Sequence, residues 1–330
     1  MSLTKEHLPM SEMLLKIINL TKSFTARSGF FSSRKLKNIA LDRVSLSVSE
    51  GETVGLVGES GCGKSTFALT VMRLYQPDGG RIFFAGKNIT HLNEKSLKSV
   101  RKQMQMVFQD PLASLDSRLT IEQIISEPLE IHRIGTKAER TAEAARLLER
   151  VGLSAEDMRR FPGEFSGGQQ QRIGIARALA LRPKLLICDE PVSALDVSVQ
   201  AQILNLLRDL QDEYALSYLF ISHNIAITAF MSRRIGVMYL GRIVEIGDSA
   251  EIVSAPRHPY TQALLAAIPE PDPSKDNKDC VVKGDIETVA ERPTGCVFRH
   301  RCPITREICA SEEPQLRRIE GNREIACHFV

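Results

Sequence analysis

One stretch decides the fold of this 330-residue chain: Gly58-Glu59-Ser60-Gly61-Cys62-Gly63-Lys64-Ser65-Thr66. Its spacing, Gly-x4-Gly-Lys-Ser, is that of a P-loop, whose glycines let backbone N–H groups turn inward around phosphates at a helix N-terminus. Lys64 is expected to neutralise charge on the β- and γ-phosphates, and Ser65 to ligate Mg²⁺. The alternative is a glycine-rich turn with an incidental lysine. The flanking sequence, a predicted strand at Thr53–Val57 and a predicted helix at Lys64–Leu74, favours the P-loop.

The composition describes a globular protein. Hydrophobic residues make up 43% of the chain, charged residues 25%, and the net charge is only +3, so no nucleic-acid partner is expected. No apolar run reaches the roughly 20 residues that cross a bilayer, and residues 1–13 lack the apolar centre of a secretory signal. These features predict a cytoplasmic chain whose membrane association comes through a partner.

Strand-like and helix-like segments alternate along the chain, which predicts an α/β fold with a mainly parallel sheet. The segment between about Leu92 and Leu181 is predicted to be helical. The predicted helices in it are Ile121–Ile131, Lys137–Val151 and Gly168–Leu181. The predicted strands are Leu14–Leu20, Val44–Val48, Thr53–Val57, Lys184–Cys188, Ser217–Ile221 and Ile235–Tyr239.

Two adjacent carboxylates, Asp189 and Glu190, end the apolar strand Lys184–Cys188. Consecutive side chains of a strand point to opposite sides, so Asp189 can enter a Mg²⁺ shell while Glu190 faces an attacking water. By itself such a pair more often marks a strand ending at a polar surface. Beside a P-loop, the catalytic interpretation is favoured.

The motif Ser166-Gly167-Gly168-Gln169 opens a predicted helix, with Ser166 as its N-cap. Two glycines at this point expose backbone amides at the positive helix end, which makes a second anion site. Taken alone, these residues slightly favour an ordinary capped helix.

In this order, the three motifs resemble the ATP-binding subunits of ATP-binding-cassette (ABC) transporters, over about residues 13–250. The resemblance implies an α/β P-loop NTPase (RecA-like) core with an antiparallel β subdomain. It also implies an inserted helical subdomain at about 92–181. An ATPase domain, residues 1–250, is then followed by a small cysteine-rich extension, residues 251–330. Phe165 stands where the family's signature usually has leucine. Because one subunit's signature closes over its partner's ATP, a second ATPase subunit is expected.

Other positions match this family residue by residue. Gln109 matches the glutamine that contacts Mg²⁺ and the water and leads to the membrane subunits, and His223 matches the histidine that senses the γ-phosphate. Asn224 replaces the aspartate that commonly follows that histidine. Phe24 matches the aromatic residue that stacks on adenine, and Ser193-Ala194-Leu195-Asp196 resembles the D-loop. Outside this context such residues would more often be ordinary surface, structural or core residues.

The end of the chain resembles the tail of dipeptide/oligopeptide and nickel importer ATPases, through Pro256-Arg257-His258-Pro259-Tyr260-Thr261 and Gly295-Cys296. A stretch from Asp272 to Asp279 is a predicted linker. The cysteine-rich part beyond it has too little apolar periodicity to build a core unaided.

Four cysteines in that tail, Cys296, Cys302, Cys309 and Cys327, resemble the cluster that holds a four-iron four-sulfur centre in some members. Four thiolates also suit structural zinc. The absence of C-x2-C pairs favours iron–sulfur over zinc, and unliganded thiols remain the alternative. Cys280 is unassigned, while Cys62 and Cys188 are expected to be buried fillers.

The resemblance implies an ATP-hydrolysing subunit that binds ATP and Mg²⁺ and energises uptake of dipeptides or oligopeptides across a bacterial inner membrane. Lys64, Gln109, Glu190 and His223 are its expected catalytic residues. Its expected partners are a second ATPase subunit, two integral membrane permease subunits and, indirectly, a periplasmic or lipid-anchored substrate-binding protein. The chain would then lie on the cytoplasmic face of the membrane.

Two alternatives remain open: a nickel or metal-complex importer, and a soluble ABC ATPase of translation or repair, which usually has two cassettes in one chain. A non-catalytic metal-binding regulator is disfavoured because Glu190 and His223 are both present. The sequence does not identify the transported peptide, nor whether the ATPase pair is a homodimer or a heterodimer.

Overall fold

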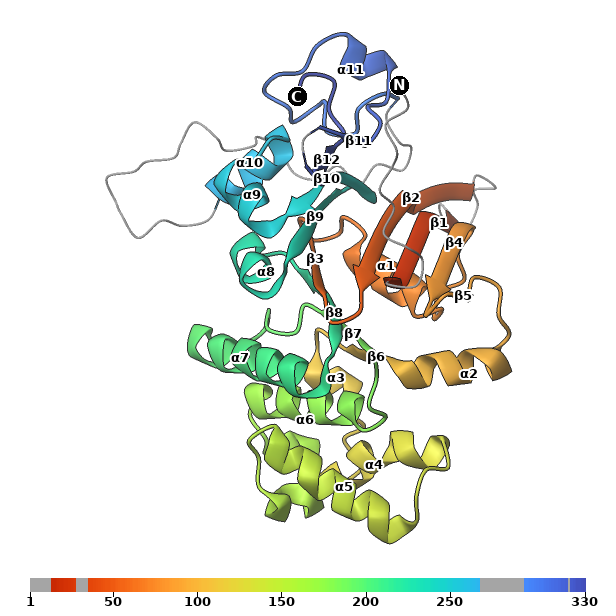
Figure 1. The fold of residues 1–330 in the computed structure, drawn as a ribbon, viewed down its shortest axis with the longest axis vertical. Helices are drawn as coiled ribbons and strands as arrows, with labels where there is room; N and C mark the ends of the chain where they lie inside the picture. Colours follow the sequence, from red (N-terminus) through yellow and green to blue (C-terminus); the bar gives the residue numbers. More distant parts are fainter. Residues whose placement is uncertain (1–12, 28–34, 268–293, 320) are drawn as a thin grey trace. The chain divides into compact units, whose positions relative to one another are not determined.

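The computed structural model describes residues 13–27, 35–267, 294–319 and 321–330 (Figure 1). The chain divides into two compact units. The first, called here the helical unit, comprises Met1–Leu14, Val48–Glu52 and Phe84–Ile221. The second, the P-loop unit, comprises Leu15–Ser47, Thr53–Phe83 and Ser222–Val330.

The helical unit is built on three neighbouring parallel strands. In the middle, β7 (Leu185–Asp189) pairs with β6 (Met104–Val107) on one side and β8 (Ser217–Ser222) on the other. Every residue of β7 and β8 is buried, as expected for parallel strands covered on both faces. The short strand β6 lies inside the segment predicted to be helical, so that prediction was wrong there. Pairing with β7, which is distant in sequence, makes these four residues a strand.

The helices of this unit begin where side chains cap them. Thr120 and Thr136 form capping boxes that start α4 (Ile121–Ile131) and α5 (Lys137–Arg150). These two helices have the predicted first residues, because a capping box is a local signal. The other helices are α2 (Glu94–Gln103), α3 (Pro111–Ser114), α6 (Gly167–Leu179) and α7 (Val197–Tyr214), with short 3-10 turns η1 (Ala155–Arg159) and η2 (Pro162–Glu164) and a two-residue strand β5 (Lys87–Asn88).

The P-loop unit contains two groups of strands. One has the order β2-β1-β4, from β1 (Met13–Arg27), β2 (Lys35–Ser49) and β4 (Gly79–Phe84). The other has the order β11-β12-β10-β9-β3. Its members are β3 (Thr53–Val57), β9 (Arg234–Tyr239), β10 (Arg242–Asp248), β11 (Arg317–Arg318) and β12 (Glu324–Ile325).

In this second group, β3 pairs in parallel with β9, and the following pairs are antiparallel. The helices of the unit are α1 (Lys64–Val71), α8 (Ile225–Met231), α9 (Ser249–Ser254), α10 (Pro259–Ala266) and α11 (Ile308–Ser311). Among the described residues, no helix is both long and apolar enough to span a membrane.

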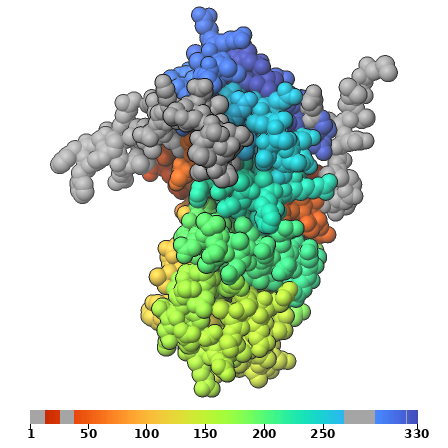
Figure 2. Space-filling view, turned by 90° about the vertical axis from the view of Figure 1, so that its left-hand side faces the viewer, coloured from red at the N-terminus to blue at the C-terminus, as the bar shows by residue number. Residues whose placement is uncertain are grey.

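The C-terminal segment, residues 294–330, is part of the P-loop unit's core and lies beside α9 and α10 (Figure 2). Phe298 is 1% exposed and packs against Tyr239 and Tyr260 with ring centroids 5.2 and 5.4 Å apart. A buried ion pair, between Arg323 and Glu245, accompanies the pairing of β12 with β10. The segment therefore uses the apolar core of the preceding chain. Cys280 and the predicted linker, 272–279, lie outside the described residues.

Candidate functional site

The loop between β3 and α1 has the backbone that its glycines allow. Gly63 has φ +111°, and a Cβ added there would lie 2.5 Å from the Ala40 carbonyl oxygen. A Cβ at Gly58 would lie 2.2 Å from the Met238 carbonyl oxygen. Distances below 3.0 Å against backbone leave no room for a side chain. Close packing against two neighbouring strands thus explains the glycines at both positions.

Lys64, the first residue of α1, is 4% exposed and its side chain lies over this loop. Its Nζ donates hydrogen bonds to the carbonyl oxygens of Gly58, at 2.8 Å, and Glu59, at 3.0 Å. The ammonium is therefore held at the loop whose pattern predicts phosphate binding. Cys62 is buried beside it, and burial raises the pKa of its thiol, so it is the expected buried filler.

Glu59 has partners that the sequence did not reveal. Its backbone N–H donates to the Tyr260 hydroxyl at 2.9 Å. Its two carboxylate oxygens accept from Arg301, at 2.7 and 2.9 Å. No local pattern signals these contacts, because Tyr260 and Arg301 lie 201 and 242 residues further along the chain.

Two further predicted residues of this unit lie on the surface. Phe24, 38% exposed, contacts the Tyr75 ring edge-to-face with centroids 5.3 Å apart. His223 is exposed in the turn between β8 and α8. The next residue, Asn224, caps α8 by accepting from two backbone N–H groups at 2.9 and 3.2 Å. Asparagine thus caps this helix as aspartate could.

In the helical unit, Gln109 and Glu190 meet because of strand register. The parallel pairing of β6 with β7 places Val107 opposite Cys188, and each catalytic candidate lies two residues beyond. The Gln109 Nε2 donates to Glu190 Oε2 at 3.2 Å. This contact leaves the amide oxygen of Gln109 for another partner. The sheet thus brings together two residues that the sequence separates by 81 positions.

The backbone turns sharply at Glu190. Its φ is +48°, a left-handed conformation that costs a residue other than glycine about 1–3 kcal/mol. The N–H of Glu190 donates to the Ile221 carbonyl at 2.9 Å, which holds the turn to β8. Asp189 and Glu190 are 5% and 9% exposed. A strained, buried pair of carboxylates at a strand end is typical of a functional site.

The Ser166–Gln169 motif forms a reciprocal cap at the start of α6. Ser166 N–H donates to Gln169 Oε1 at 2.9 Å, and the Ser166 hydroxyl accepts from Gln169 N–H at 3.4 Å. Ser166 and Gly167 are exposed at the helix N-terminus. Gly168 packs against α7 so closely that an added Cβ would lie 2.4 Å from Val199 Cγ1.

Phe165, which replaces the leucine of the family signature, is 7% exposed. Its ring lies 4.4 Å from the Arg160 guanidinium, a cation–π contact. A larger side chain is thus accommodated without exposing it.

The neighbouring D-loop is held by Gln200 Nε2, which donates to the carbonyl oxygens of Val192 and Leu195 at 3.0 and 2.9 Å. Asp196 is the N-cap residue of α7.

The structure gives no support for the metal site predicted at the four tail cysteines. Cys296 and Cys309 are buried, Cys302 and Cys327 are partly exposed, and all four are free thiols. Burial, with the other three cysteines contributing, raises the pKa of Cys302 to about 11. In the described part of the chain, no group of three or more His, Cys, Asp or Glu side chains is placed to hold a metal ion.

Known protein families match the chain in two places. Residues 41–193 match the ABC transporter family, and residues 244–309 match the oligopeptide/dipeptide transporter C-terminal region. The chain is an ATP-binding-cassette ATPase. Within this class, it belongs to the family of ATP-binding subunits that carry the oligopeptide/dipeptide transporter C-terminal region.

Curated relatives match nearly the whole chain. The oligopeptide transport ATP-binding protein AppF of Bacillus subtilis is 49% identical over 322 residues, which cover 96% of this chain and 98% of that protein. The probable peptide ABC transporter ATP-binding protein y4tS of Sinorhizobium fredii is 48% identical over 319 residues, covering 97% and 90%.

Solved structures confirm the cassette fold. A dimeric post-hydrolysis state of the ATP-binding cassette MJ0796, bound to ADP and Pi, is 29% identical with a TM-score of 0.64, covering 71% of this chain and 98% of that one. CbiO1 from Clostridium perfringens, part of the ABC transporter complex CbiONQ, is 27% identical with a TM-score of 0.64, covering 74% and 92%. The P-loop NTPase fold predicted from the motifs is thus confirmed.

Proposed function

We propose that this chain is the ATP-hydrolysing subunit of an importer that takes up oligopeptides or dipeptides across a bacterial inner membrane. The single observation that carries this proposal is the near end-to-end similarity, at 49% identity, to an oligopeptide transport ATP-binding protein. The match of residues 244–309 to the oligopeptide/dipeptide transporter C-terminal region supports the same substrate class. Peptide uptake is therefore favoured over a nickel or metal-complex importer, and over an ATPase of translation or repair.

The proposed reaction is in-line attack of water on the γ-phosphate of ATP. Glu190 orients the water, and the hydrogen bond from Gln109 fixes the rotamer of that carboxylate. When ATP binds, the Lys64 ammonium breaks its hydrogen bonds to the loop carbonyl oxygens and contacts the phosphates. There it offsets the negative charge that develops on them. His223 contacts the γ-phosphate from its exposed turn, and Phe24 stacks on adenine.

A magnesium ion fits the chemistry of the donor set. The Ser65 hydroxyl, an Asp189 carboxylate oxygen and the amide oxygen of Gln109 are the oxygen ligands that Mg²⁺ prefers. Gln109 uses its nitrogen toward Glu190, so its oxygen remains for the metal. The ion supplies neutralisation of phosphate charge during hydrolysis.

An exposed part of the site supports a second ATPase subunit as a proposed partner. Ser166 and Gly167 lie at the open N-terminus of α6, where their amides can bind the γ-phosphate held by a second ATPase subunit. The dimeric structure of the MJ0796 cassette supports such a pair. Two integral membrane permease subunits would place the chain at the cytoplasmic face of the inner membrane. A substrate-binding protein would deliver the peptide on the other side.

An iron–sulfur cluster is left out of the proposed function. Cys296, Cys302, Cys309 and Cys327 resemble such a site in spacing only, since the described side chains form no metal-binding group. No step of the proposed reaction depends on these cysteines.

The proposal is tested by reconstituting the chain with its permease subunits and binding protein in proteoliposomes. We expect ATP-dependent accumulation of a labelled oligopeptide, and ATP hydrolysis that peptide-loaded binding protein stimulates. Accumulation of a nickel complex without peptide uptake would contradict the peptide assignment and make a metal complex the substrate. Association with ribosomes or DNA, and none with membrane subunits, would contradict the transport function.

A further inference from the structure

Glu59 joins the P-loop to the end of the chain, which lies more than 200 residues away. Its carbonyl oxygen accepts from the catalytic candidate Lys64, while its N–H and its carboxylate are held by Tyr260 and Arg301. Three separate groups of one loop residue are therefore fixed, two of them by residues outside the ATPase motifs. Any movement of the Glu59 backbone moves the carbonyl group on which Lys64 rests.

Arg301 is placed to recognise the Glu59 carboxylate. Its two terminal nitrogens each donate to one carboxylate oxygen, in the bidentate geometry that best fits a guanidinium. The Arg301 side chain is 11% exposed, and its charge lies 5.8 Å from the centre of the Tyr239 ring. The ion pair with Glu59 raises the pKa of Arg301, so the guanidinium stays charged.

The position of Arg301 is set by the core of the C-terminal segment. Its N–H donates to the Phe298 carbonyl at 3.0 Å, and Phe298 is buried among the aromatic rings of the P-loop unit. The Nε of Arg301 is buried without a hydrogen-bond partner among the described residues. A buried unsatisfied N–H costs stability, and the bidentate contact of the two terminal nitrogens with Glu59 offsets that cost.

Tyr260 holds the same loop residue from another direction. The side chain is fully buried, packed on Tyr239 with centroids 4.7 Å apart, and its hydroxyl accepts the N–H of Glu59. Because both rings belong to the same apolar cluster as Phe298, the hydroxyl oxygen has little freedom to move. Glu59 is thus held by two side chains, Tyr260 and Arg301, whose own positions are set by the aromatic core.

We propose that Arg301 and Tyr260 are positioning residues of the ATP site, which hold Glu59 so that the P-loop is already shaped for phosphate before ATP arrives. The inference deepens the proposed function, on which it rests, by assigning the C-terminal segment a part in nucleotide affinity. A loop held in its binding conformation loses less entropy on binding and therefore binds more tightly. Neither residue contacts the reacting atoms through any interaction described above.

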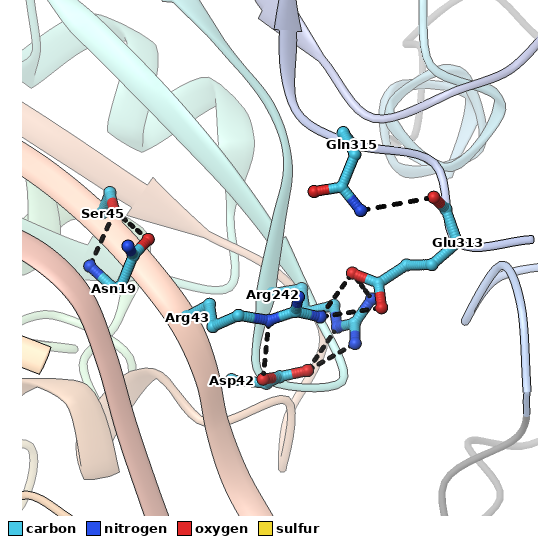
Figure 3. Close-up of polar contacts among 7 residues, drawn as sticks. All are labelled: Asn19, Asp42, Arg43, Ser45, Arg242, Glu313 and Gln315. Carbon is cyan, nitrogen blue, oxygen red and sulfur yellow. Dashed lines mark hydrogen bonds and ion pairs between the residues drawn. The ribbon is translucent and has the colours of Figure 1, made fainter. Parts of the chain in front are cut away.

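A second ion-pair network provides a matched control (Figure 3). Arg43 donates to both carboxylate oxygens of Glu313, at 2.6 and 2.7 Å, and Arg242 bridges Asp42 and Glu313. This network ties the same C-terminal segment to β2 and β10, but it contains no P-loop residue. It separates an effect on the P-loop from general loosening of the segment.

The experiment measures the Kd of a nonhydrolysable ATP analogue with Mg²⁺ for the full chain, together with Tm in the absence of nucleotide. For Arg301→Met we expect a rise in Kd of about fivefold to tenfold, and a similar rise for Glu59→Ala. The Kd of the Arg301→Met/Glu59→Ala double variant should not exceed the larger of the two single-variant values, because both substitutions remove the same interaction. Tyr260→Phe, which loses only the hydroxyl, should raise Kd about threefold. Arg43→Met should lower Tm as Arg301→Met does, yet leave Kd within twofold of the wild type.

The proposal is overturned if Arg301→Met and Glu59→Ala leave Kd within twofold or lower it. Independent, additive effects of the two substitutions, or an equal rise in Kd for Arg43→Met, would also overturn it. Should Arg301→Met fail to fold, Glu59→Ala and Tyr260→Phe decide the outcome by the same limits. Failure of the wild-type chain to bind the analogue at all would instead contradict the proposed function.

Discussion

The P-loop and the C-terminal segment of the same unit are built in opposite ways. The P-loop is short and local: glycines whose added Cβ atoms would clash with neighbouring backbone give it its shape, and the first residue of α1 completes it. The C-terminal segment has only a four-residue helix and two two-residue strands among its described residues. Ion pairs and aromatic contacts with residues far away in sequence hold it in place.

This difference explains why one region can be recognised by its sequence and the other only by a resemblance. A local loop needs particular residues at fixed spacing, and such a motif can be recognised in the sequence alone. A segment held by distant partners leaves no such pattern. The ion pair between Arg301 and Glu59 nevertheless joins the second region to the first.

The largest expected effect tests how strongly the C-terminal segment depends on distant partners. Arg323→Met should lower the free energy of unfolding by about 3–5 kcal/mol, because it leaves the Glu245 carboxylate buried without its cation. Glu245 is 0% exposed, and Arg323 donates to its Oε1 through Nε at 2.9 Å. Denaturant unfolding of the full chain measures the loss. The control is Arg318→Met, an exposed arginine of the same segment. Equal stability of the two variants would show that the segment does not rely on its buried pair.

The second prediction concerns chemistry carried by a local motif. Glu190→Gln keeps the size of the side chain but removes the carboxylate, so ATP turnover should fall by about 10²- to 10³-fold. ATP affinity should be retained, because the charge that contacts phosphate lies on Lys64. Steady-state hydrolysis in the assembled transporter and equilibrium binding measure the two quantities. Glu149→Gln, at an exposed position of α5, should change neither. Turnover of Glu190→Gln near the wild-type rate would contradict the catalytic assignment.

The smallest expected effect is a dependence of the unfolding free energy on pH, which arises because His258 is buried. Burial lowers the pKa of His258 from 6.5 to about 4. Between these values the unfolded chain binds a proton that the folded chain does not, so stability falls as the pH falls from about 6.5 to about 4. The loss between pH 7 and pH 5 should be roughly 2 kcal/mol. Glu245, which accepts the backbone N–H of His258, is already paired with Arg323.

Unfolding free energy measured against pH checks this prediction. The His258→Asn variant keeps an acceptor for the Tyr260 N–H, which now binds His258 Nδ1 at 3.1 Å, but it has no imidazole to titrate. Its stability should vary less over this range than that of the wild type. His91→Asn, at an exposed position, should leave the slope unchanged. If the unfolding free energy of His258→Asn changes with pH as much as that of the wild type, a group other than His258 causes the dependence.

Sequence reasoning succeeded where structure is set by neighbouring residues. The strand Thr53–Val57 and the helix Ile121–Ile131 have the predicted bounds, since turn and capping signals lie in the adjacent residues. Ser166 is the predicted N-cap of α6 for the same reason. The buried positions of Cys62 and Cys188 were also predicted correctly.

Sequence reasoning failed where a distant partner decides. Strand β6 was predicted to be helical, because its pairing with β7 cannot be seen from four residues. The burial of Cys296 and Cys309 in the core around Phe298 was likewise not predicted, and the structure gives no support for the metal site predicted at the four tail cysteines. Their spacing gave no information about that packing.

The sequence by itself determined the class of this protein, because P-loop, signature and Asp189-Glu190 chemistry depends on residue types at fixed local spacing. Only the tertiary structure decided that Gln109 reaches Glu190, and that Arg301 and Tyr260 hold Glu59. These contacts depend on strand register and on the packing of one buried aromatic cluster. Both are properties of the folded chain as a whole, since each needs segments from distant parts of the sequence to meet.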